Sequence, residues 1–185
     1  MKNSSFIRGK VPITKEEVRA ISIMKLDLVN AKRFVDVGAG TGSVSIEAAY
    51  NYPNLEVTSI ERNEDALDLV NQNIEKFKLE NIRLIKGEAP VKLDEKVDAI
   101  FLGGTGSRLE DIILWSKENL VSGGRLVANF IIVDTFNECL NLFKKHGFKE
   151  LDVSVLNVSK LEKLGRGEYF KPLNPIYIIS CEKGE

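Results

Sequence analysis

The sequence has few of the residues on which most catalytic and metal sites depend. Its 185 residues include one histidine, two cysteines and one tryptophan. The cysteines, Cys139 and Cys181, fall in apolar segments, so they are interpreted as buried thiols of a reducing compartment. His146 stands at the expected end of a helix, where a cation meets the helix dipole favourably. The composition therefore predicts no metal site and no histidine acting as a base.

The chain also lacks an excess of charge and long apolar runs. Its formal net charge is −1, so it has no strong basic field of the kind that attracts nucleic acids. No apolar run approaches the length of a membrane span, and residues 1–10 lack the apolar core of a signal peptide. A hydrophobic content of 43% is ordinary for a globular protein. We therefore expect one cytoplasmic domain over residues 1–185, without nucleic-acid or membrane partners.

One stretch predicts a ligand site. An apolar strand over residues 34–37 runs into a glycine-rich loop, and an amphipathic helix follows from about residue 43. The loop consists of Gly38, Ala39, Gly40, Thr41 and Gly42. Glycines permit a tight turn and a close approach of a ligand to the main chain. The helix amino terminus offers free N–H groups, so the stretch predicts a nucleotide-type cradle.

Two carboxylates flank this loop and indicate which ligand it suits. Asp36 stands two residues before Gly38, and Glu61 follows the next apolar strand, over residues 57–60. Glu61 can accept both hydroxyl groups of a ribose, whereas Asp36 suits an ammonium group better than a pyrophosphate. Ser43 stands where dinucleotide folds carry their third glycine. The pattern resembles the cofactor loop of class I methyltransferases, which bind S-adenosylmethionine.

Strands and helices alternate along the chain. Strands are expected near residues 34–37, 57–60, 82–85, 97–102 and 125–133, with helices near 43–51, 64–79, 109–119 and 134–146. Strands over residues 151–158 and 175–181 follow without a helix between them, so they should pair antiparallel at one edge. This order predicts an α/β, Rossmann-like class I methyltransferase fold. Its mostly parallel seven-stranded sheet should carry helices on both faces and an antiparallel C-terminal hairpin.

The loops after the strands hold further candidate residues, because ligands of open α/β sheets bind beyond the carboxyl ends of strands. Arg62 follows the second strand. After the third strand, the backbone of Ala89 can pair with the edge of an adenine, and Glu88 is either a second contact or a solvated loop acid. After the fourth strand, Gly103 and Gly104 leave an opening toward which a reactive methyl group should point.

Two segments outside this alternation carry expectations of their own. Thr14 and Glu17 have the spacing of a capping box, which predicts Thr14 as the N-cap of an added first helix. Residues 159–174 read as a long basic loop that carries Lys160, Lys163, Arg166 and Lys171. With Arg8 and Arg108, these cations suggest an anionic substrate. A solvated loop balanced by neighbouring acids is an equally consistent interpretation.

Longer motifs resemble one family of methyltransferases. They are FIRGKVPITKEEVRA from residue 6, VDVGAGTGSVSIEAA from residue 35, IERNEDAL from residue 60, GEAP from residue 87 and FLGGTG from residue 101. The family is that of the decarboxylating cobalt-precorrin-6B carbon-15 methyltransferases of cobalamin biosynthesis. The resemblance extends over nearly the whole chain, and the segment around Thr14 is its most specific part.

The resemblance implies an activity and a site. The expected reaction is methylation of carbon-15 of a precorrin, with loss of carbon dioxide from a ring acetate, by a homotetramer. Thr14, the glycine loop, Glu61 and Ala89 are implied at the S-adenosylmethionine site, so residues 1–30 should contribute to it. An enamine-like carbon of this tetrapyrrole can attack without a strong protein base, and no catalytic residue is identified. Arg8 and Arg166 are the leading candidates for docking substrate carboxylates.

Two other functions stay open at this point. A class I methyltransferase with another small-molecule, RNA or protein acceptor would share the loop, although near-neutral charge and few aromatic residues beside the basic segment disfavour RNA. A non-catalytic nucleotide-binding module would also share a glycine loop. Ser43, in the place of a third glycine, disfavours the dinucleotide form of such a module.

Overall fold

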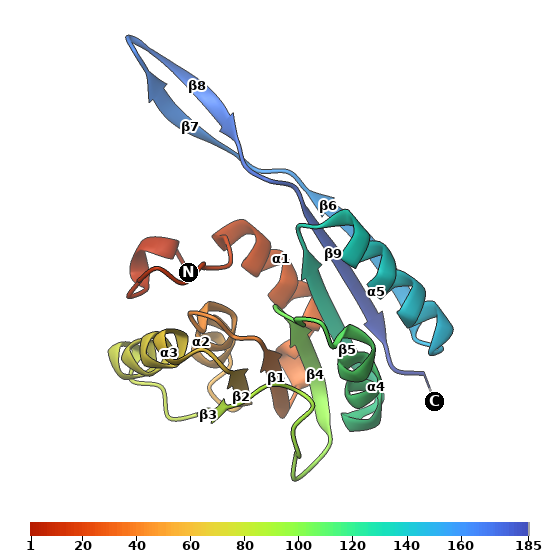
Figure 1. The fold of residues 1–185 in the computed structure, drawn as a ribbon. Helices are drawn as coiled ribbons and strands as arrows, with labels where there is room; N and C mark the ends of the chain where they lie inside the picture. The colour runs from red at the N-terminus through yellow and green to blue at the C-terminus, as the bar shows by residue number, and fades with distance from the viewer. Residues whose placement is uncertain (185) are drawn as a thin grey trace.

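A seven-stranded sheet forms the centre of the computed structural model, which describes residues 1–184 (Figure 1). The strands in the order β3-β2-β1-β4-β5-β9-β6 are Ile82–Lys86, Glu56–Glu61, Arg33–Val37, Val97–Leu102, Leu120–Phe130, Ile176–Glu182 and Lys149–Leu156. Strands β1 to β5 pair in parallel, and β9 runs antiparallel to both of its neighbours. The expected fold class is confirmed.

Helices cover both faces of this sheet. They are α1 Glu16–Leu26, α2 Ser43–Asn51, α3 Glu64–Phe77, α4 Leu109–Asn119 and α5 Val133–Lys145, with 3-10 turns at Asn3–Ser5 and Leu28–Asn30. Helices α1 and α2 pack on one face, with α3 beside α2, and α4 and α5 pack on the other. Among the described residues, no helix has both the length and the apolar character needed to cross a membrane.

The strands feed two separate apolar cores because successive side chains of a strand point to opposite faces. Phe34, Phe101 and Val127 are buried beneath α1 and α2. Their chain neighbours, such as Val35 and Ile100, are buried beneath α4 and α5. This alternation also fixes the face on which any polar residue of a strand must lie, including those at the strand ends.

The expected boundaries of β5 and α5 were wrong by a few residues. Strand β5 begins at Leu120 and ends at Phe130, three residues before its expected end. Helix α5 begins at Val133, with Ile132 at the N-cap position, so Asp134 lies in the first turn and is not the cap. The apolar residues after Phe130, Ile131 to Val133, have the composition of a strand, although their side chains are exposed.

The predicted capping box of α1 is also wrong. The helix begins at Glu16, and Lys15 at the N-cap position makes no side-chain capping bond. The partners expected to cap each other are engaged elsewhere: Glu17 forms an ion pair with Lys160. The backbone carbonyl of Thr14 accepts a hydrogen bond from Arg19, 2.7 Å away. Local spacing identified the helix start to within two residues but not its hydrogen bonds.

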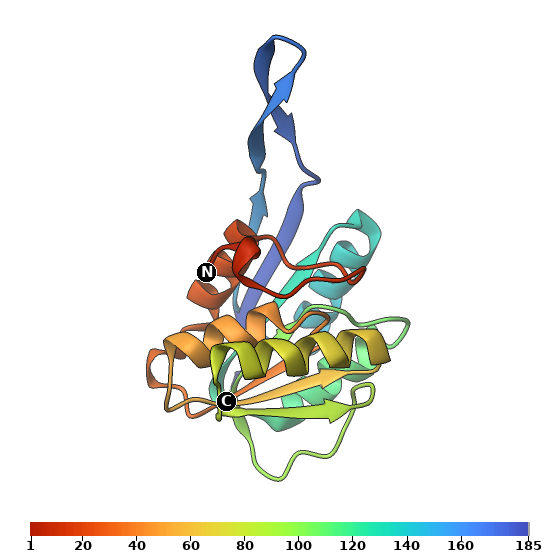
Figure 2. The same ribbon diagram turned by 90° about the vertical axis from the view of Figure 1, so that its left-hand side faces the viewer.

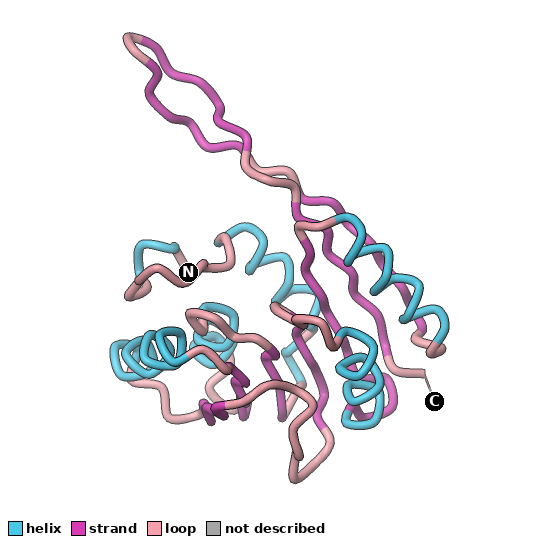
Figure 3. Tube along the Cα trace, viewed as in Figure 1, coloured by secondary structure: helices cyan, strands magenta, loops and turns pink. Residues whose placement is uncertain are grey.

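Residues 159–174 form a hairpin and not the expected irregular loop. Strands β7, Ser159–Leu164, and β8, Gly167–Pro172, pair antiparallel and stand away from the body (Figures 1 and 3). The backbone groups of this hairpin satisfy one another, which gives it regular structure without packing against the body. Its apolar side chains are left exposed, namely Leu161, Leu164, Tyr169 and Phe170.

Candidate active site

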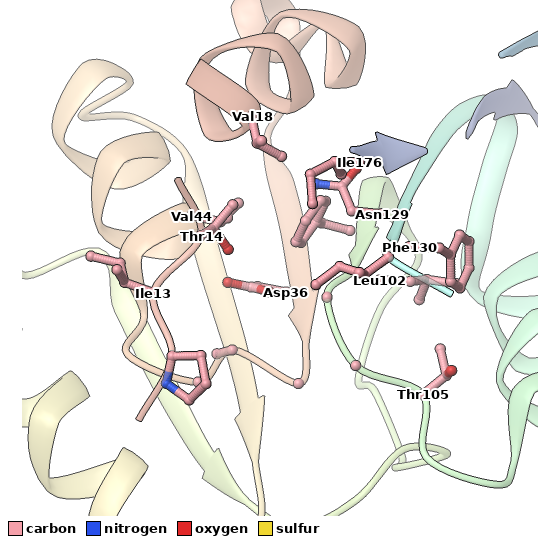
Figure 4. A pocket seen from close by; sticks show the side chains of 18 of the residues that line it. Ile13, Thr14, Val18, Asp36, Val44, Leu102, Thr105, Asn129, Phe130 and Ile176 are labelled. Atoms are coloured by element: carbon pink, nitrogen blue, oxygen red, sulfur yellow. The ribbon is translucent and has the colours of Figure 1, made fainter. Parts of the chain in front are cut away.

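The main cavity, of about 470 Å³, opens at the carboxyl ends of β1, β4 and β5 (Figure 4). One side carries Thr14, Asp36 and Val44, and the opposite side carries Asn129 and Ile176. The volume falls in the range of small-molecule sites. Its position matches the rule that open α/β sheets bind ligands beyond the carboxyl ends of their strands.

The glycine loop forms the floor of this cavity by bringing two backbone segments into contact. Gly38 has a φ of +71°, and a side chain there would place its Cβ only 2.7 Å from the carbonyl oxygen of Gly104. Gly38 and Gly104 both line the main cavity and a second one of about 160 Å³. The contact between the loops after β1 and β4 therefore lies where the two cavities adjoin.

Asp36 is the buried charge of the main cavity. Its Oδ2 accepts hydrogen bonds from the backbone N–H and the hydroxyl group of Ser45, while its Oδ1 has no partner among the described residues. Burial raises the pKa of Asp36 to about 6, and the nearby charge of Glu61 acts in the same direction. A buried carboxylate with a free oxygen is suited to a cationic or hydrogen-bond-donating ligand.

Glu61 is held in place by main-chain donors. Its Oε2 accepts from the N–H of Gly40 at 2.8 Å, and its Oε1 accepts from the N–H groups of Arg62 and Asn63 at 2.8 Å. These bonds connect the end of β2 to the glycine loop. A carboxylate offers about four acceptor positions, so the side chain retains capacity for a ligand in the smaller cavity that it lines.

The smaller cavity gathers the residues expected after β2 and β3. Ala89 is buried, and Glu88 forms an ion pair with Arg62 at 3.0 Å. All three residues line the cavity together with Gly106. Glu88 is therefore a member of this wall, although its carboxylate is already paired with a cation.

The N-terminal segment, defined here as residues 6–15, forms a wall of the main cavity through residues 11–15. Figure 2 shows this segment, in red, running alongside α3. Two buried side chains hold it down. Asn73 of α3 pairs with both the N–H and the carbonyl group of Ile7, at 2.8 and 3.1 Å. Arg19 is fully buried and bonds to Glu47 and to the carbonyl of Thr14. The hydrogen bond from Arg19, and not a helix cap, therefore holds Thr14 at the cavity.

The arginines expected to dock a substrate do not line either cavity within one chain. Arg8 is exposed on the N-terminal segment, and Arg108 pairs with Asp111 at the start of α4. Arg166 occupies the exposed turn of the β7–β8 hairpin, far from the main cavity (Figure 1). Among the described residues that line the main cavity, the only cation is Lys15.

Sequence reasoning missed most of the side chains that line the main cavity, including four at the ends of β4 and β5. These are Thr105, Asn129, Ile131 and Ile132. The expected end of β5 at residue 133 placed the last three inside a strand and hid their position at its carboxyl end. A correct strand end would have revealed them. Within residues 1–184, no group of three or more histidine, cysteine or acidic side chains is arranged to hold a metal ion.

A family model described as the precorrin methyltransferase domain matches residues 6–183. The chain belongs to the precorrin methyltransferase family. The cobalt-precorrin-6B C(15)-methyltransferase (decarboxylating) of Salmonella typhimurium is 47% identical, over 100% of this chain and 97% of its own. The resemblance inferred from the sequence motifs is confirmed, and the chain is a methyltransferase.

Two solved structures of precorrin enzymes share the whole fold. The precorrin-6y C5,15-methyltransferase from Geobacter metallireducens has a TM-score of 0.91 at 36% identity, covering 99% of this chain and 97% of its own. A precorrin 8w decarboxylase from Methanobacterium thermoautotrophicum has a TM-score of 0.88 at 28% identity, covering 98% of both chains. The similarity includes the ends of the chain as well as the central sheet.

Proposed function

We propose that this precorrin methyltransferase methylates carbon-15 of cobalt-precorrin-6B and decarboxylates a ring acetate, in cobalamin biosynthesis. The observation that carries the proposal is the 47% identity to the Salmonella typhimurium protein over the full chain. The two adjoining cavities support it, because a cofactor and a large acceptor must meet at one end of the sheet.

The residues of the two cavities fit S-adenosylmethionine, which when bound supplies the electrophilic methyl group. The free Oδ1 of Asp36 is suited to the cofactor ammonium group, and the backbone of residues 38–40, which lines the cavity, would face the cofactor. The buried hydroxyl of Thr41 also lacks a partner among residues 1–184. Glu61 is placed to accept from ribose hydroxyls.

The smaller cavity is suited to the adenine. The buried Ala89 leaves space for a flat ring, and the paired side chains of Arg62 and Glu88 would border its edge. Thr14 and Gly103, which line the main cavity, would contact the methionine part of the cofactor. Gly104, which lines both cavities, would leave an opening through which a methyl group could be transferred into the main cavity.

The main cavity offers an apolar surface to the acceptor. Ile131 and Ile132 lie at its wall with exposed fractions of 59% and 63%, so they can cover the face of a macrocycle. Phe101 and Phe130 would exclude water around the reacting carbon, and positioning supplies much of the rate acceleration for an in-line transfer. Lys15, which lines this cavity, would pair with a substrate carboxylate.

Docking by the predicted arginines would involve parts of the substrate outside the cavity. Arg8 and Arg108 are exposed and could meet carboxylates that extend over the rim. Arg166 could do so only in the site of another copy of the chain, because its own hairpin leads away from the cavity. An isolated two-stranded hairpin with exposed apolar side chains is marginally stable in water, which supports a homo-oligomer, the tetramer implied by the family resemblance.

Mass spectrometry of the acceptor tests the proposed function. Cobalt-precorrin-6B incubated with the protein and S-adenosylmethionine should gain one methyl group and lose one carbon dioxide. Methyl gain alone would assign the decarboxylation to another protein or site. An unchanged acceptor, with S-adenosylmethionine still bound in calorimetry, would contradict the proposed substrate while leaving the cofactor in place.

A further inference from the structure

Asn129 is a polar residue of the main cavity to which the proposed function so far gives no role. It lies at the carboxyl end of β5, on the same face as Val127 and thus beneath α1. Because Leu102 pairs with Ala128, Asn129 lies level with Gly103 on the neighbouring strand. Asn129 therefore stands one strand away from the position at which the reactive methyl group is expected.

The orientation of its amide group is fixed by a chain of hydrogen bonds. The hydroxyl group of Ser22, fully buried in α1, donates to the carbonyl of Val18 at 2.8 Å. Because its one hydroxyl proton is directed at Val18, the Ser22 oxygen accepts a hydrogen bond from Nδ2 of Asn129, at 2.8 Å. The amide group of Asn129 is therefore the donor in this contact, and its Oδ1 is turned away from Ser22.

The Oδ1 of Asn129 is left without a partner. It has no hydrogen-bond donor among residues 1–184 although it is inaccessible to solvent, and the side chain forms part of the cavity wall (Figure 4). Most buried polar atoms in folded proteins are paired, and an unpaired one lowers stability. The protein therefore keeps an oriented acceptor in the wall of its reaction cavity, across from Asp36.

We propose that Asn129 is a ligand-binding residue, whose Oδ1 accepts a hydrogen bond from a bound reactant, and that Ser22 positions it. The inference rests on the proposed function. The donor is a polarised hydrogen, and it can come from two sources. One is the cofactor, through its ammonium group or the C–H bonds of its sulfonium methyl group. The other is the acceptor, through a polarised hydrogen of its ring or of a side chain.

Paired substitutions at Asn129 test this role. Asn129→Leu keeps the side-chain size and removes the oxygen, so it should lower kcat/KM for methyl transfer by about tenfold or more. Asn129→Asp keeps an acceptor oxygen and should retain activity within about threefold, since Ser22 can turn its proton toward a carboxylate. Should the leucine variant fail to fold, Asn129→Ala removes the same oxygen with less steric conflict.

Affinity for the cofactor separates the two sources of the donor. Calorimetry with S-adenosylmethionine should show a loss of affinity in Asn129→Leu if the cofactor is the donor. Unchanged cofactor affinity with a higher KM for the acceptor would assign the donor to the tetrapyrrole. Equal activity and equal cofactor affinity of Asn129→Leu and the wild type would overturn the inference. So would an equal loss in the leucine and aspartate variants, because that result would require the amide N–H.

Ser22 has a matched control on the opposite face of the sheet. Ser116 is likewise fully buried and donates to the carbonyl four residues earlier, at 2.7 Å, but neither it nor its partner Ile112 lines the main cavity. Ser22→Ala and Ser116→Ala should lower the melting temperature similarly. Only Ser22→Ala should lower kcat/KM, by about threefold or more, as the Asn129 amide loses its fixed orientation. Similar kcat/KM values in both variants would remove Ser22 from the inference.

Failure of this inference can be told apart from failure of the proposed function. An inactive wild-type protein would contradict the proposed function and, with it, the role of Asn129. An active wild-type protein with an equally active Asn129→Leu variant would contradict only the role of Asn129.

Discussion

The N-terminal segment and the β7–β8 hairpin both lie outside the alternation of strands and helices, yet they are ordered in opposite ways. The N-terminal segment has no regular structure, but Asn73 and Arg19 hold it against the body (Figure 2). The hairpin has a complete backbone ladder over β7 and β8, but it projects from the body with its side chains exposed.

The difference shows that regular structure and attachment to the core are separate properties. Only the N-terminal segment reaches the main cavity, because buried polar groups of α1 and α3 bind its backbone. The hairpin joins the body at its base, where Lys160 pairs with Glu17 and Lys15 donates to the carbonyl of Asn174. Substitutions should therefore affect stability in the first region far more than in the second.

The largest effect is expected at Arg19. Arg19→Met should lower the free energy of unfolding by about 3–5 kcal/mol, because the carboxylate of Glu47 keeps only the N-terminal amino group as a partner and the acceptors on Asn3, Thr14 and Met1 lose their buried donor. Urea denaturation measures this change. The matched control is Lys171→Met in the hairpin, which removes an ion pair that is half exposed on both sides. Equal losses in the two variants would contradict the comparison.

Asp36 should show the opposite sign, although it lines the same cavity as the anchored segment. Its folded-state pKa of about 6 lies above the ordinary aspartate value of 3.8, so between these pH values folding binds a proton, and the charged form lowers stability. The stability that comes from keeping Asp36 protonated is fully present below about pH 4 and is lost as the pH rises through about 6. Asp36→Asn should therefore stabilise the ligand-free protein by up to about 3 kcal/mol at pH 7.5.

The test of this prediction is the pH dependence of unfolding. The difference between Asp36→Asn and the wild type should shrink between about pH 7.5 and pH 4, since the wild-type carboxyl group becomes protonated. The same variant should bind S-adenosylmethionine at least about tenfold more weakly, because it loses a charged partner of the ligand. A pH-independent difference in stability would show that the Asp36 charge is not its cause.

A smaller effect is expected at Asn73. Asn73→Leu should lower the free energy of unfolding by about 1–3 kcal/mol, because the N–H and carbonyl groups of Ile7 lose their partners. In the same variant, hydrogen exchange at the Ile7 amide should become faster, because this N–H group has lost its acceptor. Asn119→Leu is the control, since the side-chain amide of Asn119 bonds only to Trp115 of its own helix. Unchanged exchange at Ile7 would mean that other contacts hold the segment.

The smallest effect on folding is expected in the hairpin. Leu161 and Phe170 are cross-strand neighbours with exposed fractions of 56% and 69%. Replacing both with glutamate should leave the melting temperature of a monomer almost unchanged and should shift the light-scattering mass toward the monomer. Arg166→Ala, at the turn, should leave the mass unchanged. A double variant with the wild-type mass would contradict assembly through this surface.

The sequence was sufficient for the central fold and for one side of the candidate site. Strand, loop and helix around residues 34–51, with Asp36 before the loop and Glu61 after the next strand, are local patterns, and each element formed where the pattern predicted. The absence of a helix between the last two expected strands also predicted their antiparallel pairing at the sheet edge, which is confirmed. These features depend on backbone preferences and on the pattern of apolar residues, and both can be recognised in a short stretch of sequence.

The opposite side of the site was decided by contacts between distant residues. Ser22 and Asn129 are 107 positions apart, and the bond between them exists only because α1 packs on β5. The anchoring of Ile7 by Asn73 spans 66 positions in the same way. The sequence by itself determined the succession of strands and helices along the chain, the glycine loop and the family. Tertiary structure alone decided which arginines stay outside the cavity and which polar side chains face it, because packing between elements sets side-chain partners and local patterns do not.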